Sequence, residues 1–199
     1  MRLCRFEQDG KAQAGFYFDK HIVPVAAAAK AVQGKTDRKL SLGNGDELLP
    51  LLPHGKRHAD TKIVAAWLEK HPNAVGELAA KGARLRTPIP RPNKLFLLAG
   101  NYAKHIEEGG GIAVARAKTF PYVFMKPAST ALNHPDGEIP IPKVSPNHID
   151  WECELAFVIG KKAKGVTEAD ALEHVAGYTV VNDISDREFK PNPDREERK

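Results

Sequence analysis

The sequence of 199 residues lacks most of the features that would place it in a specialised class of protein. It has only two cysteines, Cys4 and Cys153, which are too few for a disulfide framework and have no metal-site spacing. No apolar run approaches the roughly 20 residues that a transmembrane helix needs. Charged residues interrupt the N-terminus, so it has no apolar stretch of the kind that a secretory signal contains. We therefore expect a cytoplasmic protein with no membrane-spanning segment.

Aromatic residues are also few, at 7% of the chain, and the positive charge is not gathered in one place. The 30 Lys and Arg residues outnumber the 25 Asp and Glu residues, for a formal net charge of +5. They occur in short runs without interleaved aromatic residues on which bases could stack. This pattern argues against nucleic-acid binding and favours either a solvated surface or attraction of small anionic substrates. The 42% of hydrophobic residues and the mean hydropathy of −0.41 are typical of a folded globular protein.

The first part of the chain has the pattern of a small mixed domain. Apolar alternation around the turn signal Asp9-Gly10 predicts an antiparallel meander with strands at 3–6, 14–18 and 21–25. A Gly- and Asn-rich loop follows at 41–46. Helical periodicity then predicts one helix over about 62–70 and a second from Pro72 to about Gly82. The expected apolar stripe of the first helix consists of Ile63, Ala66, Trp67 and Lys70.

Three prolines in 87–92 cannot belong to a helix or a central strand, so they predict an extended connector. We therefore divide the chain into a first domain with its connector at 1–90 and a second part at 91–199. Nearly continuous apolar runs in the second part predict buried strands, at 94–99, 122–125, 138–141, 152–159 and 177–181. A near capping box predicts a helix over 167–175. The charged stretch 190–199 is expected to be loop or disorder.

Two carboxylates stand two residues apart at the head of one of these strands. In a strand, Glu152 and Glu154 project from the same face. The next strand runs into Asp183, which brings a third carboxylate to a strand end. Three carboxylates without matching Cys or obligatory His suit a hard divalent ion, Mg²⁺ or Mn²⁺ with Ca²⁺ also compatible, rather than zinc. The alternative is a solvated acidic strand edge.

Another group of polar residues follows the strand at 94–99. His105 and Glu108 are three residues apart, so on a helix they would share a face and could form a dyad for general-base work. The alternative is an ordinary surface histidine. The glycines at 109–111 predict a mobile segment that could cover the site as a lid.

Two cationic residues are candidates for substrate binding. Lys126 leaves an apolar strand just before a proline, so its ammonium group points either into a cleft or to solvent. Arg187 follows Asp183 by four residues, and its guanidinium group could bind a substrate carboxylate through two parallel hydrogen bonds.

Taken together and in this order, these segments resemble the fumarylacetoacetate hydrolase superfamily. The resemblance rests on four motifs, which are Gly100-Asn101-Tyr102-Ala103-Lys104-His105 with Glu108, Phe124-Met125-Lys126-Pro127, Asp150-Trp151-Glu152-Cys153-Glu154-Leu155, and Ala176-Gly177-Tyr178-Thr179-Val180-Val181-Asn182-Asp183 with Arg187. It implies an α+β, β-rich fold, with a mixed β-roll or sandwich catalytic domain after a small N-terminal α+β domain. It also implies that the chain lacks the C-terminal part of the catalytic domain, which in the family supplies a second lysine and further core strands.

The resemblance further implies roles for the residues named above. Glu152, Glu154 and Asp183 would bind Mg²⁺ or Mn²⁺, and His105 with Glu108 would activate water or move protons. The remaining candidates would bind the substrate, namely Tyr102, Lys126 and Arg187. The expected activity is hydrolysis of a carbon–carbon bond in a 2,4-dioxo acid such as an acylpyruvate, fumarylpyruvate or fumarylacetoacetate, as in aromatic catabolism.

Two alternatives to that activity stay open. The same metal site could serve an isomerase or a decarboxylase of related oxo-acids, such as a hydroxyhepta-dienedioate isomerase or an oxaloacetate decarboxylase. The chain could also be a non-catalytic binder of small anions. The expected partners are a small oxo-acid substrate and a second copy of the chain in a homodimer, with neither nucleic acid nor membrane.

Overall fold

A computed structural model describes residues 1–108, 110, 112–113, 118 and 120–187. The described residues form two compact units, one made of 1–86 with 136–187 and the other of those between 87 and 135. The domain boundary predicted near residue 90 stays a prediction. The charged stretch predicted to be loop or disorder at 190–199 lies outside the described residues, as does most of the glycine segment 109–111.

The N-terminal meander is confirmed. Strands β1 (Leu3–Gln8), β2 (Lys11–Tyr17) and β3 (Ile22–Pro24) pair antiparallel. The turn between β1 and β2 holds Asp9 and Gly10 at φ of 51° and 73°, as a two-residue hairpin with a type I′ twist requires. A short strand that the sequence pattern did not predict, β4 (Arg84–Arg86), pairs with β1, so the sheet order is β3-β2-β1-β4.

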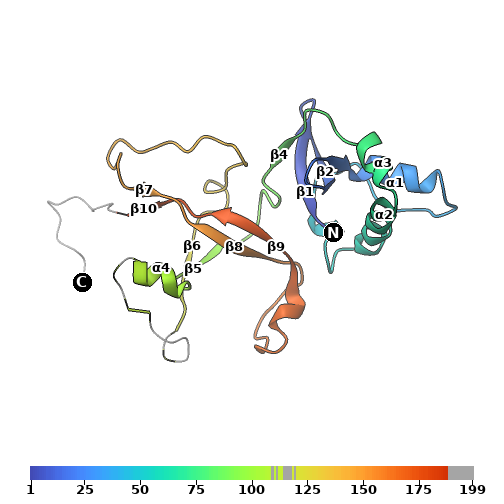
Figure 1. Cartoon of the computed structure of the whole chain (residues 1–199). Coiled ribbons are helices and arrows are strands. Elements are labelled where there is room, and N and C mark those ends of the chain that lie inside the picture. Colours follow the sequence, from blue (N-terminus) through green and yellow to red (C-terminus); the bar gives the residue numbers. More distant parts are fainter. Residues whose placement is uncertain (109, 111, 114–117, 119, 188–199) are drawn as a thin grey trace. The chain divides into compact units, whose positions relative to one another are not determined.

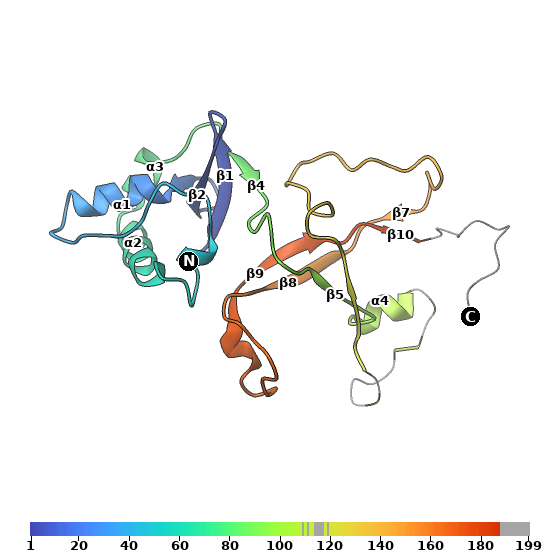
Figure 2. The same ribbon diagram turned by 180° about the vertical axis from the view of Figure 1, so that it is seen from behind.

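Helices lie along one side of this sheet (Figures 1 and 2). They are α1 (Val25–Gln33), the 3₁₀ turn η1 (Leu49–Leu51), α2 (His58–Lys70) and α3 (Pro72–Glu77). The sequence did not predict α1, and α3 ends five residues before the expected Gly82. No helix in the described part of the chain is both long and apolar enough to cross a membrane.

The predicted stripe of α2 is wrong. The helix buries Thr61, Val64, Ala65 and Leu68, which are spaced three or four residues apart. Trp67 instead stacks on the ring of His71 at a centroid distance of 4.4 Å, with the Lys35 ammonium group 5.4 Å from its ring. Trp67, which the hydropathy pattern assigned to the core, is therefore only half-buried, and the His71 ring and the Lys35 ammonium group lie against it.

The core of the chain lies between the N-terminal sheet and its helices. Phe6 and Phe16 are at most 2% exposed, and Val23 and Val64 are fully buried. A methyl group on Gly15 would lie only 2.9 Å from the ring of Phe6, so this ring needs a residue without a side chain beneath it. Among the described residues, the only buried hydrophobic side chains outside this region are Leu97 and Ala176.

Four further strands lie in the C-terminal part of the same unit. They are β7 (Ile149–Asp150), β8 (Cys153–Ile159), β9 (Val175–Asn182) and β10 (Ser185–Asp186). The strands predicted at 152–159 and 177–181 are confirmed in β8 and β9. The strand predicted at 138–141 is wrong, because this segment is irregular and its Pro140 has no N–H to donate to a ladder.

The helix predicted over 167–175 is also wrong. The segment has turns, one 3₁₀ turn η3 (Ala171–His174), and then Val175 as the first residue of β9. Thr167 and Asp170 do form the expected local hydrogen bonds, with Thr167 Oγ1 donating to the Asp170 carboxylate at 2.6 Å. The bonds close a single turn, and the β-branched residue Val175 already belongs to the extended strand that follows.

The second unit is built on one antiparallel pair, β5 (Phe96–Ala99) and β6 (Tyr122–Met125). Both strands are where the sequence predicted them, but the prediction that they are buried is wrong, because Leu97 is the only buried residue of the two strands. The short helix α4 (Ala103–Glu108) follows β5. Buried Thr87 links the two ends of the unit, because its hydroxyl donates to the carbonyl of Asn133 at 2.9 Å and lies 2.9 Å from His134 Nδ1.

The expectation of buried strands is not met in β8 and β9. These strands form a two-stranded ribbon, and one of its faces is apolar and more than half exposed. The residues of this exposed apolar face are Leu155, Phe157, Ile159, Tyr178 and Val180, at 53–70% exposure. The continuous apolar runs of these two strands predicted burial on both faces of the ribbon. In the described structure only the face opposite the exposed apolar face is partly buried.

Candidate metal centre

The predicted carboxylates lie at an interruption between two short antiparallel ladders. In the β8–β9 ladder Cys153 faces Asn182, and in the β7–β10 ladder Asp150 faces Ser185. Both pairs belong to the same register, so the two ladders are one pairing interrupted at Trp151 and Glu152 on one side and Asp183 and Ile184 on the other. Glu152 therefore lies opposite Asp183.

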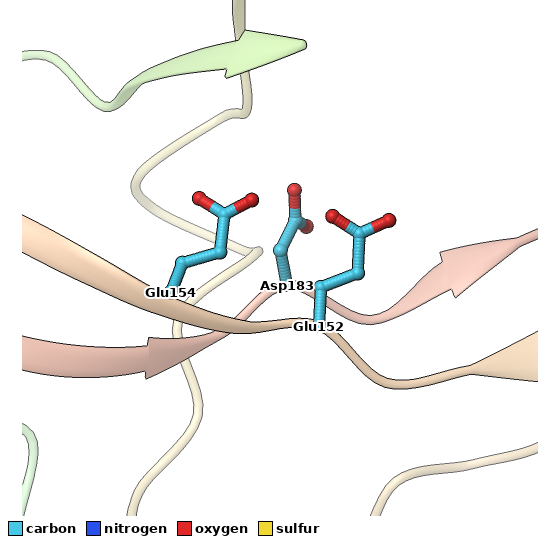
Figure 3. Close-up of side chains that lie close together, drawn as sticks. All are labelled: Glu152, Glu154 and Asp183. Carbon is cyan, nitrogen blue, oxygen red and sulfur yellow. The ribbon is translucent and has the colours of Figure 1, made fainter. Parts of the chain in front are cut away.

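This register explains why three carboxylates converge. Glu152 and Glu154 share a face because they are two residues apart, and residues directly opposite each other in an antiparallel pair also share a face. Each of Glu152, Glu154 and Asp183 offers an oxygen within 4.8 Å of those of the other two. Figure 3 shows the three carboxylates rising from the same side of the ribbon. Asp183 is only 6% exposed, and the two glutamates are half-buried.

Backbone contacts hold the interrupted segment in place. The Asp183 N–H donates to the Glu152 carbonyl at 2.9 Å, which keeps the two acidic residues opposite each other. The Glu152 N–H donates to the side-chain oxygen of Asn182 at 3.0 Å. Asn182 thus supplies from its side chain a bond that a regular ladder would take from the backbone, and this allows the strands to separate locally without leaving the Glu152 N–H unpaired.

A guanidinium group borders the three carboxylates. Arg187 Nη1 lies 2.6 Å from Glu152 Oε1, and Arg187 Nε lies 3.0 Å from Asp150 Oδ2. The hydrogen bond to Asp150, with the bond to Glu152 and the charge of both carboxylates, raises the pKa of Arg187. Arg187 was predicted to bind a substrate carboxylate, and in this structure its partners are two carboxylates of the protein itself.

The donor set fits a hard divalent cation. It is made of carboxylate oxygens alone, which Mg²⁺, Mn²⁺ and Ca²⁺ accept and which offer neither the thiolates nor the imidazoles typical of zinc. Oxygens of like charge within 4.8 Å of one another repel, and a cation among them would offset that repulsion. Within the described part of the chain, Glu152, Glu154 and Asp183 are therefore residues that could hold such an ion.

The other predicted site residues belong to the second unit. His105 and Glu108 both lie in α4, and the side chain of His105 lies outside the described part of the chain. Tyr102 directly precedes that helix and is exposed, and the backbone N–H of Lys126, just after β6, donates to the carbonyl of Leu95. The dyad and the two substrate-binding roles remain predictions.

Two residues around the acidic cluster were not predicted, Asp150 and Asn182. Asp150 stands in the same motif as the glutamates, two residues before Glu152, and so on the same face of an extended chain. That spacing was the available signal for Asp150. Asn182 directly precedes Asp183, and its contact with Glu152 depends on the register of β8 and β9, which a single sequence does not specify.

Comparison with known families identifies the protein class. A profile described as the C-terminal domain of fumarylacetoacetate hydrolase matches residues 94–196, which is more than half of the chain. The matched segment contains every candidate site residue named above. The chain therefore belongs to the fumarylacetoacetate hydrolase family.

Several relatives match between half and two thirds of the chain. An oxaloacetate tautomerase of Xenopus laevis named fahd2, mitochondrial, is 41% identical over 113 residues, which are 57% of this chain and 34% of the relative. The oxaloacetate tautomerase YisK of Bacillus subtilis is 35% identical over 135 residues, 66% of this chain and 44% of the relative. The human oxaloacetate tautomerase FAHD2A, mitochondrial, is 40% identical over 103 residues, 52% of this chain and 31% of the relative. These matches span less than half of each relative.

Solved structures share the fold. A fumarylacetoacetate hydrolase from Exiguobacterium antarcticum has a TM-score of 0.59 at 24% identity and covers 93% of this chain and 56% of its own. The maleylpyruvate hydrolase from Sphingobium sp. SYK-6, solved with manganese(II) ion and pyruvate, has the same TM-score and identity and covers 94% and 60%. The fold is therefore the β-rich α+β fold of fumarylacetoacetate hydrolases, as the sequence motifs implied.

Proposed function

We propose that this chain carries the divalent-metal site of an enzyme that acts on small 2-oxo acids. The observation that carries the proposal is the convergence of Glu152, Glu154 and Asp183 within 4.8 Å, in the segment that matches the family. A divalent ion bound there would act as a Lewis acid on the 2-oxo acid, an effect worth several kcal/mol. Manganese in the solved maleylpyruvate hydrolase supports an ion of this type.

Within this proposal, different residues bind the ion, transfer the proton and bind the substrate. The three carboxylates hold the ion, and a half-buried site keeps their charges effective. His105, oriented by Glu108, moves the proton, a contribution of roughly 10²–10⁴-fold. Lys126 and Tyr102 bind the polar groups of the substrate.

The proposed reaction is keto–enol tautomerisation of oxaloacetate or a similar dicarbonyl acid. The relatives with 35–41% identity named above are oxaloacetate tautomerases by name. The reaction moves one proton from carbon to the carbonyl oxygen and needs no co-substrate, so one acid–base group beside a Lewis acid suffices. This choice ranks an isomerase above the hydrolase that the motifs first suggested.

Hydrolysis of a carbon–carbon bond in a 2,4-dioxo acid is the second candidate. The solved structure with manganese(II) and pyruvate, which is a maleylpyruvate hydrolase, favours it, although at 24% identity it supports the fold more than the reaction. A decarboxylase of the same substrates and a non-catalytic anion binder complete the alternatives.

The metal site is tested by Mn²⁺ calorimetry on the wild type and on Glu154→Gln and Asp183→Asn. We expect both substitutions to weaken binding strongly, to a Kd that titration at higher Mn²⁺ concentrations still measures, because each removes one of three anionic ligands. Glu173→Gln is the matched control, since Glu173 is an exposed carboxylate of the same unit in η3, and we expect it to bind as the wild type does. Unchanged binding in Asp183→Asn would remove Asp183 from the site.

The reaction is tested by following the enol absorbance of oxaloacetate and of acylpyruvates, with Mg²⁺, Mn²⁺ or EDTA. A tautomerase accelerates enol loss from oxaloacetate without forming pyruvate, a decarboxylase forms pyruvate and CO₂, and a hydrolase forms pyruvate from acylpyruvate. His105→Ala should lower the rate by the factor given above. A binder would retain ligand affinity and show no turnover in any variant.

We also propose that the ligand is a small oxo-acid, that the protein works as a homodimer without nucleic acid or membrane, and that it is cytoplasmic. Some relatives carry the word mitochondrial in their names, so fractionation of the native cell is the test of location.

A further inference from the structure

Hydrogen bonds hold Asp150 and Arg187 beside the acidic cluster. The two residues belong to the paired segments β7 and β10 or directly follow them, and the Arg187 N–H donates to the His148 carbonyl at 2.9 Å. One oxygen of Asp150 accepts the N–H of Trp151 at 2.9 Å, and the other accepts Arg187 Nε at 3.0 Å. The Asp150 carboxylate and the Arg187 backbone are therefore each held by contacts that do not involve Glu152.

Arg187 contacts one oxygen of a candidate metal ligand. Its Nη1 lies 2.6 Å from Glu152 Oε1, a short, charge-assisted contact. A carboxylate has two oxygens and several lone pairs, so it can accept a hydrogen bond from a guanidinium group and still offer an oxygen to a cation. Without Arg187, the Glu152 side chain could rotate about its flexible stem, and rotation would disperse the three converging oxygens.

We propose that Arg187, held by Asp150, is a positioning residue that orients Glu152 for the divalent ion. The inference rests on the proposed metal site. It assigns Arg187 a role inside the protein, in place of the substrate-carboxylate clamp that its spacing from Asp183 suggested.

Two effects of Arg187 on the ion have opposite signs. Its positive charge repels a divalent cation, whereas its hydrogen bond fixes a ligand. The Arg187 side chain is 38% exposed, and Asp150 balances its charge at 3.0 Å, so solvent and this partner weaken the repulsion. Partners that orient a metal ligand typically change metal affinity by roughly 10–100-fold. Orientation therefore outweighs repulsion, and removal of Arg187 weakens the binding of the ion.

The test measures the Kd for Mn²⁺ by calorimetry in the wild type, Arg187→Gln, Arg187→Lys and Asp150→Asn. We expect Arg187→Gln to weaken binding by roughly 10–100-fold. Asp150→Asn should weaken binding less, because Arg187 then still has its ion pair with Glu152. Arg187→Lys should restore part of the affinity, since a lysine can reach one carboxylate but cannot bridge two as the planar fork does.

A double variant separates orientation from simple charge. In a Glu152→Gln background, Arg187→Gln should cause no further loss of Mn²⁺ affinity, because its effect passes through Glu152. Arg84→Gln is the matched control: it removes an arginine charge from an ion pair of the N-terminal sheet, with Glu7 at 3.2 Å, and should leave the Kd unchanged.

The outcomes distinguish the two proposals. Tighter or unchanged Mn²⁺ binding in Arg187→Gln, with normal binding by the wild type, would overturn the positioning role and leave the metal site intact. An equal loss with and without the Glu152 carboxylate would also overturn it. Absence of Mn²⁺ binding by the wild-type chain would overturn the metal site and this inference with it. Circular dichroism of each variant identifies losses that arise from unfolding, and Arg187→Lys keeps the comparison usable if Arg187→Gln does not fold.

Discussion

The N-terminal sheet and the β8–β9 ribbon have similar apolar strands but very different burial. Phe6 in β1 is 0% exposed, whereas Phe157 in β8 is 53% exposed. The N-terminal strands have helices against one side (Figure 1), and an apolar face buried in this way loses its contact with water. The ribbon pairs its own backbone but leaves the exposed apolar face in contact with solvent. Apolar alternation thus specifies a strand, and its burial depends on what covers it.

The ribbon carries polar chemistry on its other face. Leu155 and Glu154 are neighbours in β8 and point to opposite sides, so the exposed apolar face and the carboxylate cluster lie back to back. The N-terminal sheet has no comparable group among the described residues, and its acidic Glu7 is paired with two arginines. The densely packed region therefore provides stability, and the less covered region provides the candidate site.

The largest effect should come from a matched pair of phenylalanine substitutions. Phe6→Ala removes a fully buried ring and should lower the free energy of unfolding by about 3–5 kcal/mol. Phe157→Ala should cost less than about 1 kcal/mol, since the ring already contacts water and packs edge-on against the Tyr178 ring at a centroid distance of 5.2 Å. Urea denaturation of both variants measures the difference. Equal losses would show that Phe157 is covered in solution and would break the comparison.

The strands were predictable because alternation and turn residues are local. Asp9-Gly10 and the apolar residues of β1 and β2 predicted a hairpin, and the structure confirmed it. Helix α1 was missed because its run of alanines and valines follows β3 directly, and its N-cap residue Pro24 makes no side-chain cap that would signal a helix start. The strand β4 is short and charged, and its pairing with β1 is a long-range contact that no local pattern records.

The candidate metal residues were predictable for a similar reason. Glu152 and Glu154 share a face by spacing alone, and Asp183 ends the next apolar strand. What the sequence could not supply was the register that sets Glu152 opposite Asp183. It also could not supply the pairing of β7 with β10, each two residues long, which brings Arg187 to Asp150 and Glu152.

An effect of intermediate size is expected for the two cysteines, because Cys4 lies in the N-terminal sheet and Cys153 in the β8–β9 ribbon. Their reaction rates compare the burial of the two regions. Burial raises the pKa of Cys4 to about 12, so its reactive thiolate is scarce near neutral pH. Cys153 is exposed in β8. We expect a disulfide reagent to label Cys153 at least roughly tenfold faster than Cys4, which must await opening of the N-terminal sheet. Absorbance of the released thiol gives both rates.

Single-cysteine variants assign these two rates. Cys153→Ser should retain only the slow phase and Cys4→Ala only the fast one, and in denaturant both cysteines should react at similar rates. Rapid labelling of Cys4 in the native protein would mean that the N-terminal sheet opens as readily as the ribbon, contrary to the comparison.

The smallest effect concerns the ion pairs of the N-terminal sheet. A hydrogen bond from Arg86 at 2.6 Å, with the charges of Arg86 and Arg84, lowers the pKa of Glu7. Since the folded-state pKa lies below the unfolded one, Glu7 stabilises the protein above its ordinary pKa, and this contribution is lost as the pH falls through the folded-state pKa. Glu7→Gln should therefore be slightly less stable than the wild type at neutral pH and equally stable in acid. Urea midpoints across this range measure the convergence. The control is Glu77→Gln, at an exposed carboxylate of α3, and its urea midpoints should change with pH in the same way as those of the wild type. If the midpoints of Glu7→Gln also change in parallel with the wild type, β4 pairs with β1 without help from the Glu7 ion pairs.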